Sequence, residues 1–168
     1  MKKHRAALGC LSLFLSIGAF GSFPQPAWAG DSSNCESISD SDSRNHCRAV
    51  AKRDKSYCES IGNSDRRNYC RAEASGDRSY CESIGSSEMR NQCRGVSGGS
   101  SGSSSCESIS DSDARNHCRA VSKHDKSYCE SISNSDRRNY CRGVAGRDRS
   151  ACESISDSNL RNRCRAES

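Results

Sequence analysis

The chain has 168 residues and a formal net charge of +5, but only 32% of its residues are hydrophobic and 5% are aromatic. So little apolar material excludes an ordinary hydrophobic core, and the 13 cysteines indicate that covalent bonds replace part of it. The net charge falls to +2 once the basic residues Lys2, Lys3 and Arg5 of the first segment are set aside, which gives little support for nucleic-acid binding.

Residues 1–29 have the pattern of a secretory signal peptide. A basic start precedes an apolar stretch, and Ala27-Trp28-Ala29 offers a small-x-small cleavage site. We predict cleavage near Ala29 and export to the periplasm or beyond the cell. The mature chain then has no transmembrane segment and keeps twelve cysteines, because Cys10 leaves with the signal.

A 23-residue unit starts at Cys35 and recurs six times. The two cysteines within each unit are always twelve positions apart, whereas the step between units is eleven except from Cys93 to Cys106, where it is thirteen. Pairing between neighbouring units would leave Cys35 and Cys164 single, so we predict one disulfide within each unit. The predicted bonds are Cys35–Cys47, Cys58–Cys70, Cys81–Cys93, Cys106–Cys118, Cys129–Cys141 and Cys152–Cys164. Zinc binding is the weaker alternative, since close cysteine pairs are absent from the sequence and histidines are few.

Each unit is predicted to form two short helices joined by a tight turn. Ser-x-Cys-Glu opens the first helix as a capping box, although an aspartate two residues earlier, such as Asp31, is an alternative cap. The second helix carries the second cysteine on one face with the residue four before it, as in Met89, and a valine three after it, as in Val50. The serines expected to cap the second helices are Ser41, Ser64, Ser87, Ser112, Ser135 and Ser158.

The Gly/Ser-rich stretch 97–105 divides two triplets of units, 30–96 and 106–168, and reads as a flexible linker. The triplets are closely similar when one is shifted by 71 positions onto the other, which indicates a duplication on top of the repeat. The predicted fold is therefore all-α, with six disulfide-stapled helical hairpins stacked as a small solenoid or as two three-hairpin lobes.

Two arginines recur in every unit, and they form a ladder that has two interpretations. They bind an anionic ligand such as lipopolysaccharide, another polyanion or nucleic acid, or they pair with the glutamate that follows each first cysteine. The candidate anion-binding residues are Arg44, Arg48, Arg67, Arg71, Arg90, Arg94, Arg115, Arg119, Arg138, Arg142, Arg161 and Arg165.

The sequence offers no set of nucleophile, base and orienting group, and no metal or cofactor motif. His46 and His117 occupy a position that other units fill with Tyr, Gln or Arg, and such variation argues against a catalytic role there. We therefore expect a non-enzymatic, cofactor-free structural or protein-interaction role in the cell envelope or outside the cell. The expected partner is a protein or an envelope component, and the alternative is an anionic ligand.

Overall fold

The computed structural model describes residues 31–168, and helices make up all the regular structure in that part of the chain. The predicted signal peptide, residues 1–29, lies outside the described residues. None of the helices in residues 31–168 has the length and apolar character needed to cross a membrane. The all-α fold of six disulfide-stapled hairpins is confirmed.

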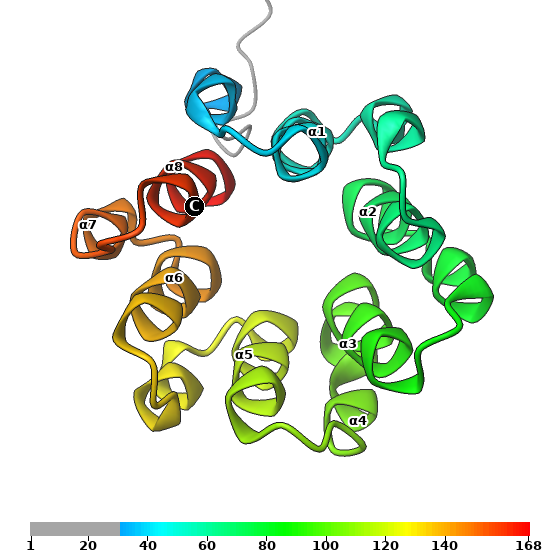
Figure 1. The fold of residues 1–168 in the computed structure, drawn as a ribbon. Helices are drawn as coiled ribbons and strands as arrows, with labels where there is room; N and C mark the ends of the chain where they lie inside the picture. The colour runs from blue at the N-terminus through cyan, green and yellow to red at the C-terminus, as the bar shows by residue number, and fades with distance from the viewer. Residues whose placement is uncertain (1–30) are drawn as a thin grey trace, which may run out of the picture.

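Each hairpin consists of a short helix followed by a longer one. The longer helices are α1 (Ser41–Lys52), α2 (Ser64–Ser75), α3 (Ser87–Ser97), α5 (Ser112–Lys123), α6 (Ser135–Gly146) and α8 (Ser158–Glu167). The short helices are η1 (Ser32–Ser37), η2 (Lys55–Ser60), η3 (Arg78–Ser83), η4 (Gly99–Gly102) with α4 (Ser103–Cys106), η5 (Lys126–Ser131) and α7 (Arg149–Cys152). Figure 1 shows the longer helices on the inside of a ring and the short ones on its outside.

The caps of both helix types fall on different residues from the serines that the sequence analysis favoured. The aspartate two residues before the predicted capping serine, such as Asp31, caps the short helix by accepting a hydrogen bond from the amide of Ser33. The long helix begins one residue earlier than expected, because Asp40 accepts from the Ser43 amide while Ser41 is already helical. The prediction of serine caps for the long helices was therefore wrong. An Asp, Asn or Ser oxygen immediately before each of these serines reaches the amide at the third helical position.

The six disulfides join the two cysteines of each unit, with Cα–Cα distances of 5.6 to 5.8 Å. Each one is buried beside the isoleucine of its own unit and a small residue of the preceding long helix. Ala49 of α1, for example, packs against Cys58, Ile61 and Cys70 of the second unit. The sulfur bridge is thus both the staple of one hairpin and the surface on which its neighbour packs.

Glycine replaces this alanine at two of the junctions between units. A Cβ on Gly95 would lie 2.1 Å from the Sγ of Cys118, and one on Gly143 would lie 2.4 Å from the Sγ of Cys164. The absence of a side chain therefore lets α3 and α6 seat directly on the disulfide of the following unit.

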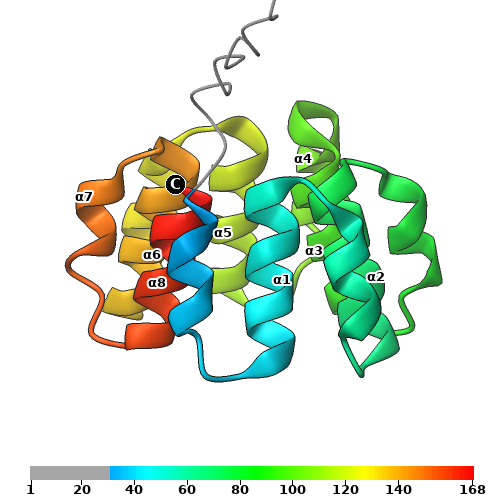
Figure 2. The same ribbon diagram turned by 90° about the horizontal axis from the view of Figure 1, so that it is seen from above.

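The stack of hairpins closes on itself, and the two triplets do not separate into lobes. Ala166 of the last helix packs on the disulfide of the first unit, as Ala49 packs on that of the second. Across this junction, the Ser39 amide donates to Asn159 Oδ1 at 3.2 Å. At other junctions, an aspartate at the position of Asn159 accepts the hydrogen bond from the corresponding turn. Figure 2 shows η1 lying beside α8, so the first and last units are neighbours.

The Gly/Ser-rich stretch 97–105 is helical over most of its length, through the end of α3, η4 and the start of α4. Gly102 is buried, and a Cβ there would lie 2.3 Å from the carbonyl oxygen of Arg94. These glycines allow the longer connection to pack against α3, so the spacing of thirteen fits the same ring.

Candidate functional site

Three positions on each long helix line the inside of the ring. They lie four residues before, one before and three after the second cysteine, a spacing that puts them on one helix face. The first position holds Ser43, Arg66, Met89, Ala114, Arg137 and Leu160. The second holds His46, Tyr69, Gln92, His117, Tyr140 and Arg163. The third holds Val50, Glu73, Val96, Val121, Val144 and Glu167. We call this set of side chains the hub, and every one of them lines at least one cavity in the ring.

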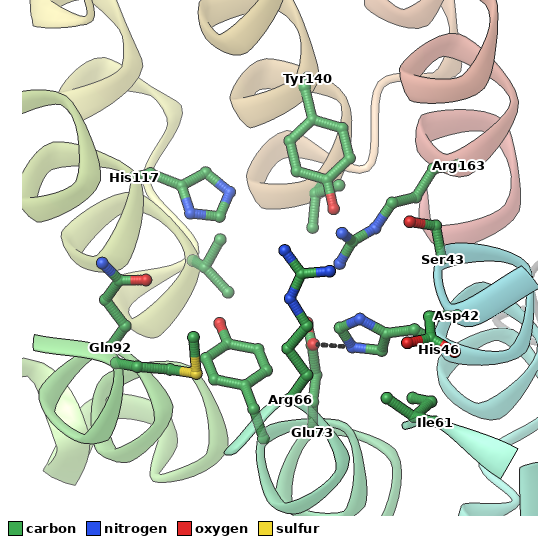
Figure 3. A pocket seen from close by; sticks show the side chains of 14 residues that line it. Asp42, Ser43, His46, Ile61, Arg66, Glu73, Gln92, His117, Tyr140 and Arg163 are labelled. Atoms are coloured by element: carbon green, nitrogen blue, oxygen red, sulfur yellow. Dashed lines mark hydrogen bonds and ion pairs between the residues drawn. The ribbon is translucent and has the colours of Figure 1, made fainter. Parts of the chain in front are cut away.

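The hub contains two adjoining cavities, of about 370 Å³ and about 440 Å³. The first is bordered by Arg66 and Arg163, and Figure 3 shows both guanidinium groups pointing into it. The second is bordered by Arg137. Tyr69, Gln92, His117 and Tyr140 line both. Cavities of this size, with aromatic walls and a few polar groups, are typical of small-molecule sites.

One side of the hub is closed by a hydrogen bond between His46 and Glu73. His46 Nε2 lies 2.8 Å from Oε2 of Glu73, and the His46 ring meets Tyr69 edge-on at 5.9 Å. Burial alone would raise the pKa of Glu73, but the hydrogen bond from His46 and the charges of His46 and Arg163 together lower it. Glu73 is therefore ionised, and its bond holds the imidazole of His46 in place.

A second carboxylate organises the opposite side. Glu167, whose side chain is only 2% exposed, accepts the hydroxyl of Tyr140 and bonds Nε of Arg163 at 2.8 Å. Burial acts to lower the pKa of Arg163, but Glu167, Tyr140 and Glu73 outweigh it and raise the pKa. The Arg163 guanidinium also lies 5.6 Å from the Tyr140 ring centroid. This arrangement keeps Arg163 charged and fixes its direction.

His117 differs from its duplicate His46 in having no bonded partner. Its ring stacks on Tyr140 at 5.6 Å, and its Nε2 is buried without a hydrogen bond among the described residues. Val144 occupies the position that Glu73 holds beside His46. Burial, with the nearby charge of Arg163, lowers the pKa of His117 to about 4, so its imidazole is neutral near pH 7.

A second buried polar atom without a partner borders the larger cavity. Glu88 Oε2 accepts from the Ser110 amide at 3.2 Å, but Oε1 has no hydrogen bond within the region that the structure describes. Buried polar atoms are normally satisfied, so such atoms mark places where a bound molecule or water completes the structure.

The arginines of the predicted ladder are engaged within their own hairpins. Arg48 forms a two-pronged ion pair with Glu36, its Nε lying 2.8 Å from Oε1, and the arginine at this position does the same in every unit. Arg44 donates from Nη1 to the Ile38 carbonyl at 2.6 Å, and its equivalents do likewise at 2.6 to 2.8 Å. The ladder thus has the internal pairing that the sequence offered as one interpretation, and anion binding by it stays a prediction.

The hub was not predicted as a site from the sequence. The variation between His46 and its equivalents in the other units served only as evidence against catalysis. In nearly identical repeats, however, the positions that vary are those that the structure of the unit does not constrain. Their spacing on one helix face was the available signal.

Residues 31–168 contain no group of three or more His, Cys, Asp or Glu side chains that could hold a metal ion. No family model, curated protein or solved structure compared with this chain matches it.

Proposed function

We propose that this protein is an exported, non-enzymatic binding protein that uses the hub of its ring for recognition. Six disulfides fit an oxidising compartment outside the cytoplasm, which agrees with the predicted signal peptide. The ring is the scaffold, and the component that it binds comes from the cell envelope or from outside the cell.

The observation that carries this proposal is the position of the variable residues. The residue before the second cysteine is His, Tyr, Gln or Arg in different units, and all six copies line the two adjoining cavities. Residues that make the scaffold are by contrast repeated in every unit, including the cysteines, the isoleucine and the Arg–Glu pair. A scaffold with a constant frame and a varied interior supports binding better than it supports a purely structural role.

The hub supports binding more than catalysis. Glu73 already holds the Nε2 atom of His46, and Nε2 of His117 contacts no hydroxyl or thiol within hydrogen-bonding distance in the described residues. Neither histidine therefore contacts a protein hydroxyl or thiol that it could activate as a nucleophile.

The test compares two histidine variants of the oxidised protein after incubation with a small-molecule extract of culture medium. Native mass spectrometry then detects any retained mass. We expect the wild type and His124→Ala, an exposed residue at the end of α5, to retain the same mass. His117→Ala should lose it, because its ring lines both cavities. Retention by His117→Ala at the wild-type level, or no retained mass in any sample, would contradict recognition at the hub.

A further inference from the structure

We infer that the hub binds a small organic carboxylate, held between the guanidinium groups of Arg66 and Arg163. This inference rests on the proposed binding function and gives it a ligand class. The carboxylate-bearing molecule lies in the cavity of about 370 Å³, against the rings of Tyr69 and Tyr140. A hydrogen-bonding group on the same molecule reaches Nε2 of His117.

Two positively charged side chains converge on one cavity of the hub. Figure 3 shows the guanidinium groups of Arg66 and Arg163 entering the same cavity and pointing toward each other. Arg163 uses its Nε atom for Glu167, which leaves its terminal nitrogens on the cavity side. The Arg66 side chain has no ion pair or hydrogen bond among the described residues. Two arginine forks facing one space match the planar, two-oxygen geometry of a carboxylate.

An unpartnered histidine in the same cavity supports a bound ligand independently of charge. His117 Nε2 is buried, borders the same cavity and has no partner in residues 31–168. Its duplicate His46 is satisfied by Glu73, whereas Val144 beside His117 can accept or donate nothing. Buried nitrogens are normally hydrogen-bonded, so an unpartnered one that borders a cavity indicates a missing hydrogen-bonding group.

The charges around the cavity favour one carboxylate over a dianion. Asp42 and Glu73 line the same cavity, and Glu167 already neutralises Arg163. Among the arginines that line this cavity, only Arg66 has no bonded carboxylate. The acidic groups would repel a doubly charged phosphate more strongly than a singly charged acid, so a single carboxylate is the anion that Arg66 can best accommodate.

The probes are benzoate, 4-hydroxybenzoate, phenol and inorganic phosphate, titrated into the oxidised protein while the histidine ring resonances are followed by NMR. We expect both benzoates to shift the His117 signals, with 4-hydroxybenzoate the tighter of the two because its hydroxyl group can meet Nε2. Phenol, which lacks the carboxylate, and phosphate should bind at least about tenfold more weakly.

A matched pair of variants separates a local contact from general charge. Arg66→Gln should weaken 4-hydroxybenzoate by about tenfold or more, because one charge-assisted contact is lost. Arg137 is the duplicate of Arg66, 71 positions later and equally near its helix start, but it borders only the second cavity. Arg137→Gln should change the affinity by less than about twofold, because exposed charges beyond the contact are screened by salt.

Two outcomes would overturn the carboxylate assignment. One is an equal loss of 4-hydroxybenzoate affinity in Arg66→Gln and Arg137→Gln. The other is the absence of any shift of the His117 resonances with either benzoate, which would mean that only water contacts Nε2. The wild type can also retain a molecule that His117→Ala does not retain and that proves to be neutral or cationic. In that case the carboxylate inference fails while the proposed binding function stands. If nothing is retained and no probe binds, both fail.

Discussion

Acid should destabilise this ring through a single histidine. Burial, with the charges of Arg163 and Arg137, holds the pKa of His117 at about 4, and the charge of Glu73 offsets only part of this. In the unfolded chain the same imidazole binds a proton near its ordinary pKa of 6.5. As the pH falls from about 6.5 to about 4, the unfolded chain therefore binds a proton that the folded ring does not bind, and the free energy of unfolding decreases. Below the folded pKa the loss levels off.

The size of the effect follows from the same two values. Each pKa unit is worth about 1.4 kcal/mol, so a fall from 6.5 to about 4 corresponds to a loss of about 3 kcal/mol at its limit. His117 as a residue is only half-buried, so we reduce this limit to allow for screening by solvent. We expect the wild type to lose about 2 kcal/mol between about pH 7 and about pH 4.5 through this residue.

The assay is guanidinium unfolding at both pH values, followed by far-UV circular dichroism with the disulfides intact. His117→Gln cannot take up a proton, so its stability should fall by about 2 kcal/mol less than that of the wild type over the same range. The carboxylates titrate in both proteins, so the difference between them isolates His117. His124→Gln is the control, because His124 is exposed at the end of α5. Equal pH dependence in His117→Gln and the wild type would refute the assignment of the acid effect to His117.

Three further changes test the hub, the seams and the closure of the ring. Val144→Glu should give His117 the carboxylate partner that its duplicate has, which raises the pKa of His117 in an NMR titration and weakens 4-hydroxybenzoate; an unchanged pKa would contradict the pairing. Gly95→Ala should cost about 2 kcal/mol or more in chemical denaturation, because its Cβ would lie 2.1 Å from the Sγ of Cys118, and a neutral result would show that this seam is loose. A circular permutant with its ends joined by Ser-Gly and reopened within 97–105 should fold with native helicity, and misfolding would argue against ring closure.

Much of the fold was readable because the repeat is regular. The period, the pairing of cysteines within units and the two helices per hairpin all follow from spacings in the sequence. The predicted caps of the long helices were wrong by one residue because two neighbouring side chains, such as Asp40 and Ser41, both suit a cap. The structure resolves the ambiguity in favour of Asp40, which reaches the Ser43 amide at 2.8 Å.

Closure into a ring could not be read from one unit. Closure depends on the small rotation between neighbouring units, which is set by how closely each long helix approaches the next disulfide. Six such rotations must add up to a full turn. The contacts that complete the ring are those of Ala166 with the first disulfide and of Asn159 with the Ser39 amide.

The arginine ladder shows why residue type alone misplaced the candidate site. Repeated arginines such as Arg48 drew attention because they recur in every unit, yet recurrence reflects a task common to all units, here an ion pair with Glu36. Arg66 and Arg163 each stand at a variable position, and the structure brings them to the same cavity. Which face of the helix turns toward the axis depends on packing between units, which the sequence of one unit does not define.

The duplication explains how a ring of similar units acquires a one-sided site. His46 and His117 are matched across the two triplets, as are Tyr69 and Tyr140, so the aromatic walls are common to both halves. The polar partners differ, because Val144 stands opposite Glu73 in the duplication and Arg163 stands opposite Gln92. One histidine is consequently tied to a carboxylate, while the other is left with a free nitrogen in a cavity that also receives the Arg163 guanidinium. A symmetric hub would present the same groups on both sides of the axis, whereas this one places an arginine and an unpartnered histidine where one ligand can contact both.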